Sequence, residues 1–581
     1  MSNNENEKKK PCSYHTFLFP FRWELPATTD RKKFLEELRL RLDKSWWQEP
    51  PNAEKARGEE KASLIAAGYE TKQERDPLLA KERDQLYATY QYLTGPARRL
   101  VFSEERDDAR ATPAWHFALR PQASKADKEK RKYRIEKSSE NRTESFELDV
   151  RAIRLNVYNT GVAVLIFELE YYGVKYATDG IGHHFNYEKK EYLLELEKDP
   201  EKLLADINKI NEHGRRVNLP FIADLPNRLT ADRIILELED NLPFQDDFPS
   251  DGRLSLHHVM EPIRALLGLK AKLKPITDDK EKPTDEEYLI TPAIDDRMYV
   301  VCLYHNDELI KEAQRFCDGK YAYLRDWKCA EDMYKFAFIE SGCTCRSQTM
   351  IFKLLRQTVY DRWIDWGTIH AATHHSLVCL TTAGAPPLVI NPFLTMYTEM
   401  AIIALAQRAT ILALSDQAAA IANDYNPGNG CDEELRGRIA RLRDRHIRAE
   451  NQILLDEVTV QEQGEELFPM IQRGLFINRS DAKLAKQLEN LYAIADDSYK
   501  RDQEGFETKI KIFALILAAL ALPVFFEALG FSLAARWLMT LVAGAGLWLW
   551  FVNDKGRKCQ RWWCRWRAAI GKKGRGDGQP S

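Results

Sequence analysis

The longest apolar run of the chain is Ile512–Val552, in which only Glu527 and Arg536 carry charge. A single helix of this length would be about 60 Å long, about twice the hydrocarbon thickness of a bilayer. The pattern therefore predicts a hairpin of two transmembrane helices, with its turn between Glu527 and Arg536. The alternative is a buried helical hairpin in a soluble core, which the basic and aromatic residues flanking the run disfavour.

Basic residues cluster at both outer ends of this hairpin, whereas only Arg536 lies in its turn. The positive-inside rule then places both termini in the cytoplasm. We expect a multi-pass protein of the inner (plasma) membrane whose large preceding region is cytoplasmic. The basic, Trp-rich tail after Val552 is expected to contact membrane lipids in preference to RNA, so no direct nucleic-acid binding is expected.

Upstream, apolar residues recur with the period of strands in several stretches. Tyr14–Trp23 is aromatic and partly alternating, and it predicts an opening strand. Ala152–Tyr158 and Val162–Glu170 flank a short Asn-Thr-Gly sequence, which predicts a β-hairpin. Asp296–His305 and Ser376–Thr382 predict further strands.

Helical patterns alternate with these strands and dominate after Pro392. Asp199-Pro200 opens a predicted helix that runs to about Glu212, with Gly214 suited to its C′ position. The later predicted helices are Phe393–Tyr425, Glu433–Glu457 and Ser480–Lys511. Nothing interrupts the last of them before the apolar run, so we expect it to continue into the first transmembrane helix.

The predicted fold is an α/β cytoplasmic domain, followed by a long α-helical stalk and a two-helix transmembrane hairpin. The predicted regions are an N-terminal α/β region with charged insertions (1–145), an α/β ligand-sensing domain (146–385), the stalk (386–511), the hairpin (512–552) and the basic tail (553–581).

Composition adds only a few constraints to the predicted fold and function. The net charge of −3 over 581 residues implies no global electrostatic partner, and the ten cysteines show no repeating spacing. In a cytoplasmic domain that scatter favours free thiols. The N-terminus has no apolar segment of the kind a signal peptide needs. Lys125–Lys137 is a run of charges that we interpret as a solvated turn or insertion.

The layout resembles the CorA superfamily of metal-ion transporters, which are pentamers with the first transmembrane helix lining a pore. That family carries Gly-Met-Asn at the outer end of this helix. Here Pro523, Val524 and Phe525 stand in its place, followed by Phe526 and the family-like Glu527. The three residues offer no polar side chain to a hydrated magnesium ion. We therefore assign them, with Glu527, to an apolar pore or gate that closes by dewetting.

Three sequence segments resemble a more specific group of proteins. They are Ile210–Phe221, Ile294–Val300, and Trp366–Thr382 leading to Ala404–Arg408. They are similar to the CorA-like proteins encoded beside type III CRISPR systems. That resemblance implies a homo-oligomeric membrane effector, a pentamer like the other members of the family, without catalytic activity or cofactor. It also implies a nucleotide second messenger as ligand, an S-adenosylmethionine–AMP conjugate bound to the cytoplasmic domain.

Arginines and carboxylates within these segments are the candidate ligand residues. Arg215 and Arg216 could bind a phosphate, since guanidinium groups present a fork of donors; alternatively they only follow a helix C-terminus, where cations are favourable. Asn211 lies one turn earlier and could hydrogen-bond the same ligand. Asp295 and Asp296 could accept from a ribose or adenine, or pair with a sulfonium; alternatively they form salt bridges with the next residue, an arginine.

Three histidines follow, His370, His374 and His375. The first two have the spacing of metal ligands on a helix, but no glutamate completes a zinc-protease motif. Structural hydrogen bonding is the favoured interpretation. No P-loop or nucleophile motif occurs in a fitting context, so no enzymatic activity is expected.

Three functions compete. The first is the messenger-opened membrane effector that permeabilises the membrane. The second is a divalent metal-ion transporter (Mg, Co or Ni) with a diverged filter, and the third is a membrane-anchored binding protein that conducts nothing.

Overall fold

The computed structural model describes residues 10–23, 47–48, 88–102, 113–119, 131–139, 141–179, 185, 192–217, 230–238, 244–247, 259–267, 290–314, 326–342, 345–425, 433–528, 530, 532–535, 537–538, 541–542 and 544–545. The chain divides into two compact units. The first comprises Met1–Asp424 and Gly437–Glu489, and the second comprises Tyr425–Arg436 and Asn490–Ser581.

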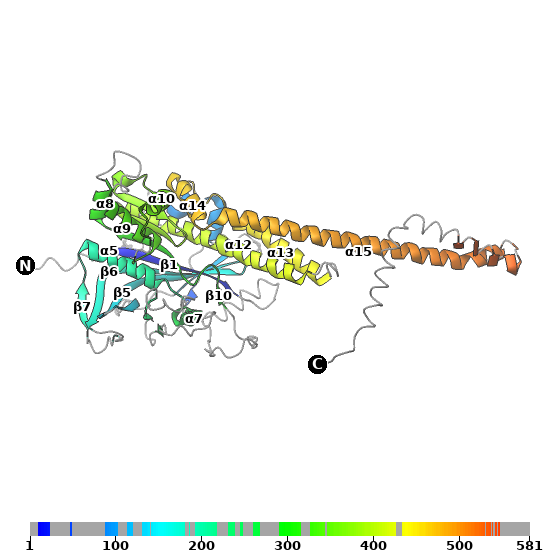
Figure 1. The fold of residues 1–581 in the computed structure, drawn as a ribbon, viewed down its shortest axis with the longest axis horizontal. Helices are drawn as coiled ribbons and strands as arrows, with labels where there is room; N and C mark the ends of the chain where they lie inside the picture. Colours follow the sequence, from blue (N-terminus) through cyan, green and yellow to red (C-terminus); the bar gives the residue numbers. More distant parts are fainter. Residues whose placement is uncertain are drawn as a thin grey trace, which may run out of the picture. The chain divides into compact units, whose positions relative to one another are not determined.

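The described strands of the first unit form one mixed sheet (Figure 1). They are β1 (Ser13–Trp23), β2 (Trp47–Gln48), β3 (Ala114–Leu119), β4 (Lys132–Ser138), β5 (Arg142–Tyr158), β6 (Val162–Asp179), β7 (Leu193–Leu196), β8 (Arg233–Glu237), β9 (Phe244–Asp247), β10 (Ile290–Pro292), β11 (Tyr299–His305), β12 (Val359–Tyr360), β13 (Thr368–Ala372) and β14 (Ser376–Thr381). The main order is β12-β13-β14-β11-β1-β6-β5-β4-β8-β9, and β11 and β14 pair in parallel.

The described helices are α4 (Gly95–Phe102), α5 (Pro200–Gly214), α7 (Glu261–Leu266), α8 (Asp307–Gln314), α9 (Trp327–Phe338), α10 (Gln348–Thr358), the short η3 (Ile364–Trp366), α11 (Pro387–Pro392), the π-helical turn η4 (Phe393–Tyr397), α12 (Thr398–Asp424), α13 (Glu433–Gln452), α14 (Glu462–Gly474) and α15 (Ile477–Ala528).

Strand β1 runs through the middle of the sheet between β6 and β11. Its odd-numbered residues Phe17, Phe19 and Phe21 join the main core, to which α5 also contributes. On the opposite face Arg22 pairs with Asp416 of α12, with Nη1 to Oδ2 at 2.5 Å. Because side chains alternate along a strand, α5 and α12 cover opposite faces of the sheet.

The predicted β-hairpin is confirmed in strands β5 and β6, which are longer than the sequence indicated. Gly161 in the turn has φ +84°, a left-handed conformation that glycine adopts without a steric penalty. The strand predicted at Tyr14–Trp23 is also confirmed, as β1. The predicted strands at Asp296–His305 and Ser376–Thr382 are confirmed in shorter form as β11 and β14.

The interpretation of Lys125–Lys137 as a solvated turn is wrong for its last six residues, which belong to β4. Tyr133 and Ile135 are fully buried there. The charged neighbours pair across the sheet, with Lys132 Nζ 2.6 Å from Glu147 Oε1. The local sequence, which is rich in charge, predicted a loop. It does not show that partners on β5 neutralise these charges in the folded chain.

Helix α5 begins and extends as predicted, but its last residue has a different role. Asp199 is the N-cap, and its carboxylate accepts from the backbone N–H of Glu201 at 3.0 Å. Gly214 lies inside the helix, whereas a left-handed C′ position was expected. A Cβ there would lie 2.5 Å from Ile135 Cδ1. Glycine is required because the helix end approaches the sheet closely.

Helix α12 confirms the helix predicted after Pro392. Most of its faces are buried, and it contacts β1 and β6. Among the described residues, Pro387–Asp424 is the one helical stretch long and apolar enough to cross a membrane, and 67% of its most apolar window is buried inside the protein. Its packing on the sheet gives the apolar surface a partner within the first unit.

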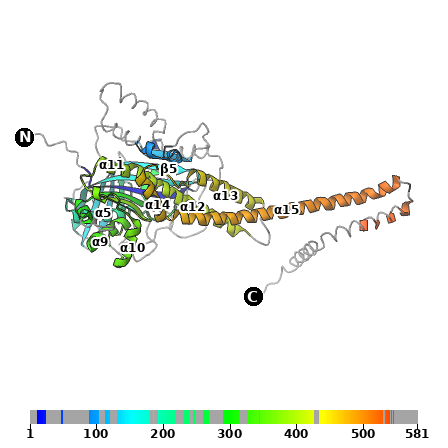
Figure 2. The same cartoon turned by 90° about the horizontal axis from the view of Figure 1, so that it is seen from above.

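Helix α15 begins at Ile477 and continues without a break to Ala528, as Figures 1 and 2 show. The prediction that the stalk helix continues past Ile512 is therefore confirmed. The helix ends inside the predicted turn, where Gly530 has φ +79°. Beyond it the structure describes only short stretches, and most of the predicted second transmembrane helix lies outside the described residues.

Candidate functional site

Three segments meet along one edge of β11. The N–H of Met298 donates to the carbonyl of Arg215 at 2.7 Å, and the N–H of Val300 donates to the carbonyl of His375 at 3.0 Å. N–H groups two residues apart on an extended chain point to the same side. The end of α5 and the turn before β14 therefore lie next to each other, at the start of β11.

Arg216 and the predicted carboxylates are paired within this site. Arg216 Nη1 donates to Asp296 Oδ2 at 2.7 Å, and Arg297 Nε donates to Asp295 Oδ2 at 2.7 Å. Arg216 also forms a β-bridge with Arg297. The structure thus brings together four of the five predicted ligand residues, and it pairs Arg216 and Arg297 with two carboxylates.

Arg215 lacks such a partner. Its side chain comes from the C-cap of α5, and the residue is only 3% exposed. Its Nε and Nη1 atoms have no hydrogen-bond partner among the described residues. Burial, and then the charges of Arg297 and Arg216, lower the pKa of Arg215 to about 9, so it remains charged at neutral pH. The carboxylates of Glu212 and Asp295 act on Arg215 only through space. An anion that accepts from its Nε and Nη1 would lower the cost of burying this charge.

The pKa values of the two carboxylates shift in opposite directions. Burial and the hydrogen bond with Asp295 raise the pKa of Asp296 to about 6. Burial also favours the neutral form of Asp295, but hydrogen bonds from Asp296 and Arg297 outweigh it and hold the pKa of Asp295 below its ordinary value. Relative to ordinary aspartates, Asp295 therefore favours its charged form and Asp296 its neutral form.

His374 and His375 join the site from the turn between β13 and β14. Their ring centroids lie 3.8 Å apart. Burial, and then the charges of Arg215 and Arg297, lower the pKa of His375 to about 2, and the same causes lower the pKa of His374. Both rings are neutral at pH 7 and offer donors and aromatic faces beside the arginines.

His370, by contrast, lies apart from this group. It is on strand β13, so the expectation of helical i,i+4 spacing with His374 is wrong. Its ring lies among aromatic residues, 5.7 Å from the ring of Phe393 and 6.0 Å from that of Tyr397. Neither ring nitrogen has a hydrogen-bond partner among the described residues, so the expected structural hydrogen bonding is not seen for His370.

Asn211 is buried beneath the site. It is 0% exposed, and its Oδ1 lies 2.7 Å from Nδ1 of His15. Because an amide oxygen only accepts, Nδ1 of His15 carries the proton, and Nε2 accepts from the Ser13 hydroxyl at 2.8 Å. Asn211 is one helical turn before Arg215 and shares its helix face. Its bond to His15 ties the last turns of α5 to β1.

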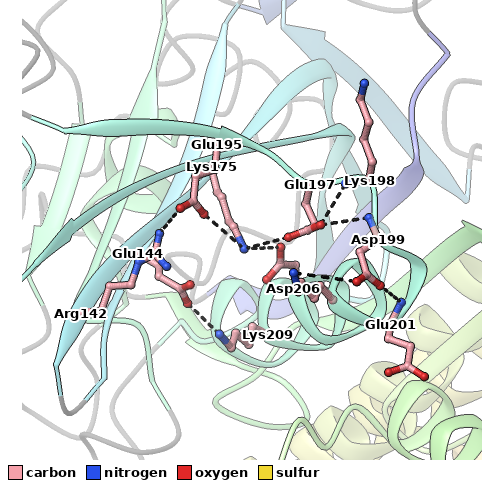
Figure 3. Close-up of polar contacts among 11 residues, drawn as sticks. Arg142, Glu144, Lys175, Glu195, Glu197, Lys198, Asp199, Glu201, Asp206 and Lys209 are labelled. Carbon is pink, nitrogen blue, oxygen red and sulfur yellow. Dashed lines mark hydrogen bonds and ion pairs between the residues drawn. The ribbon is translucent and has the colours of Figure 1, made fainter.

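The middle of α5 is held by a charged cluster around Lys175 on β6 (Figure 3). Lys175 Nζ lies 3.1 Å from Asp206 Oδ2 on α5, and 3.8 Å and 3.7 Å from carboxylate oxygens of Glu195 and Glu197. The positive charge of Lys175 is balanced by these nearby carboxylates. The cluster ties the middle of α5 to β6, and it also ties β7 to β6 through Glu195.

The predicted pore residues Pro523, Val524, Phe525 and Glu527 lie within the bounds of α15. Their backbone is helical, and their side chains lie outside what the structure describes.

Sequence reasoning missed Arg297, His374 and His375 as members of the site. Arg297 was considered only as an ion-pair partner, and the histidines only as metal or structural residues. The available signal was their position, since each lies one or two residues before a buried strand of the parallel pair β11 and β14. Adjacent starts of parallel strands lie at the same edge of a sheet.

No family model matches the chain, and neither a curated protein nor a solved structure matches it. The resemblance to CorA-like effectors remains a prediction from the sequence.

Proposed function

We propose that the chain is a CorA-like membrane effector of type III CRISPR defence, opened by a nucleotide second messenger that binds beside Arg215. The observation that carries this proposal is the buried guanidinium of Arg215, which has donors without acceptors. The neighbouring arginines already have carboxylate partners. An anionic ligand is the group that would complete the arrangement.

The S-adenosylmethionine–AMP conjugate matches the chemistry of this site. Its phosphate would accept from Arg215, and its sulfonium or amino groups would lie near the carboxylate of Asp296. The neutral rings of His374 and His375 offer surfaces for an adenine. Each part of the ligand thus has a complementary group among residues that the sheet edge brings together.

Exposed apolar side chains in the second unit support membrane insertion through a two-helix hairpin. Nine of them are between 40% and 70% exposed: Ile512, Phe513, Ile516, Leu517, Leu533, Trp537, Leu538, Leu541 and Val542. Patches of this kind mark contacts with a membrane or another chain. Lys511, at the edge of this segment, suits the cytoplasmic interface, with both termini on the cytoplasmic side.

An aromatic row on α15 supports self-association. Tyr499, Phe506 and Phe513 are spaced seven residues apart and are 59%, 65% and 63% exposed. Residues at this interval line one face of a helix and are typical of helix association in parallel oligomers. A homopentamer, as the resemblance implies, would bury this row between copies.

The test measures binding of S-adenosylmethionine–AMP to the purified full chain by calorimetry, with ATP and S-adenosylmethionine as competitors. We expect binding of the conjugate to exceed that of either competitor, and Arg215→Ala to abolish it. Liposomes containing the chain should release a trapped dye only when the conjugate is added.

Other outcomes point to the alternatives. Ion flux without nucleotide that weakens in Glu527→Ala would favour a divalent-cation transporter. Absence of flux under every condition, with the conjugate bound, would favour an anchored binding protein. A chain that does not prefer the conjugate to its two competitors would refute the proposed ligand.

A further inference from the structure

Gly474, the last residue of α14, lies against the turn that carries the two histidines of the ligand site. A Cβ at Gly474 would lie 2.8 Å from the carbonyl oxygen of Thr373 and 3.5 Å from the backbone nitrogen of His374. The first distance is shorter than real Cβ contacts, so only glycine permits this approach. All these residues belong to the first unit.

The histidine turn is held by its own hydrogen bonds. The hydroxyl oxygen of Thr373 accepts from the N–H groups of His375 and Ser376, each at 3.1 Å. The N–H of Thr373 donates to the carbonyl of Ser376 at 2.8 Å. The Tyr299 hydroxyl donates to the Thr373 carbonyl at 3.4 Å. A displacement at Thr373 therefore moves the turn as a unit.

The other side of the contact is the junction between α14 and α15. Phe476 has φ +56°, a left-handed conformation that a bulky residue adopts only where its surroundings impose it. Its N–H donates to the carbonyl of Arg473 at 3.1 Å, and its carbonyl accepts from the N–H of Ser480 at 3.1 Å. The junction is therefore bonded on both sides, and its conformation sets how α15 begins.

We propose that the contact between Gly474 and Thr373 regulates the ligand site, by coupling the histidine turn to the first turns of α15. Occupancy beside Arg215 then changes the order of the helix that continues toward the apolar segment. The ligand part of this inference rests on the proposed function, whereas the coupling itself does not.

The coupling is tested without any ligand by hydrogen–deuterium exchange of the full chain in detergent. In Gly474→Ala we expect exchange to rise about tenfold both in residues 373–376 and in residues 475–488, because both sides lose the contact. Gly505→Ala is the matched control on α15, since no heavy atom lies within 4 Å of its Cβ. It should change neither segment.

The reciprocal variant is Ser376→Ala, which removes the hydroxyl that pairs with the Thr373 hydroxyl at 2.8 Å. Coupling is reciprocal, so exchange at 475–488 should rise here too. Exchange that rises in only the mutated segment, in either variant, would overturn the inference. If Gly474→Ala does not fold, Ser376→Ala alone decides.

Adding the S-adenosylmethionine–AMP conjugate separates this inference from the proposed function. We expect the conjugate to slow exchange at residues 296–300 in the unmodified chain and in Gly474→Ala. At residues 475–488 it should slow exchange in the unmodified chain but not in Gly474→Ala. Protection at 296–300 alone in the unmodified chain would overturn the coupling and leave the ligand site intact. No protection anywhere would refute the proposed ligand, while the ligand-free comparison still decides the coupling.

Discussion

Arg216 donates to Asp296 across 2.7 Å, whereas Nε and Nη1 of the adjacent, buried Arg215 have no hydrogen-bond partner among the described residues. The two consecutive arginines at the end of one helix thus differ in their hydrogen bonds to carboxylates. Burial lowers the pKa of both, but only for Arg216 does a carboxylate accept a hydrogen bond within the described residues. The difference is measurable in the absence of any ligand.

Removal of the two charges should have effects of opposite sign on stability. We expect Arg215→Met to raise the free energy of unfolding by about 1–3 kcal/mol, since it removes an unpaired buried charge. Arg216→Met should lower it by about 1–2 kcal/mol, because Asp296 loses its partner but stays partly solvated. Thermal melting of the ligand-free chain measures both. Destabilisation of equal size in the two variants would show that Arg215 already has an anionic partner.

Acid should destabilise the protein through His15, which is fully buried and neutral. Burial lowers the pKa of His15 to about 4, against 6.5 for an ordinary histidine. Between these values the unfolded chain binds the extra proton, so the contribution is complete above pH 6.5 and is lost as the pH falls toward 4.

The loss from His15 at pH 5 should be about 2 kcal/mol. Urea denaturation at pH 7 and pH 5 measures it, with His15→Gln as the comparison. The difference in free energy between the two pH values should shrink by this amount in the variant. An unchanged pH dependence would contradict the assignment of His15 as a neutral buried group.

The close approach of α5 to the sheet should make Gly214 intolerant of a methyl group. We expect Gly214→Ala to cost about 1–3 kcal/mol, because the new Cβ would meet Ile135 Cδ1 and the Phe17 ring. Gly342→Ala is the control, since nothing lies within 4 Å of its Cβ. Ile135→Val removes the nearest methyl group, so the double variant should recover part of the loss. Full additivity of the two substitutions would argue against the contact.

The aromatic row on α15 should determine the size of the oligomer. We expect Phe506→Ser with Tyr499→Ser to lower the mass of the detergent-solubilised particle, because the proposed helix interface loses its apolar contacts. Light scattering after size-exclusion chromatography measures that mass. Met350→Ser, at a residue 48% exposed on α10, is the control. A particle of unchanged mass in the double variant would place the interface elsewhere.

The sequence by itself determined the elements whose signals are local. The Asn-Thr-Gly turn, the Asp199 cap with its following proline, and the unbroken helix from Ser480 past Ile512 each follow from residues within a few positions of one another. The sequence also singled out Arg215, Arg216, Asp295 and Asp296. Local steric and hydrogen-bonding preferences suffice for such features, so the chain states them directly.

Which of these residues the protein pairs, and which keep unpaired donors, depends on the tertiary fold. It placed Lys132 in a strand rather than a loop, and it directed Asn211 to His15 beneath the site. It brought His374 near Arg215 from a segment far along the chain, and left Nε and Nη1 of Arg215 without a hydrogen-bond partner among the described residues. Pairing of charges and meeting of strand ends depend on contacts between distant segments, which local patterns do not encode.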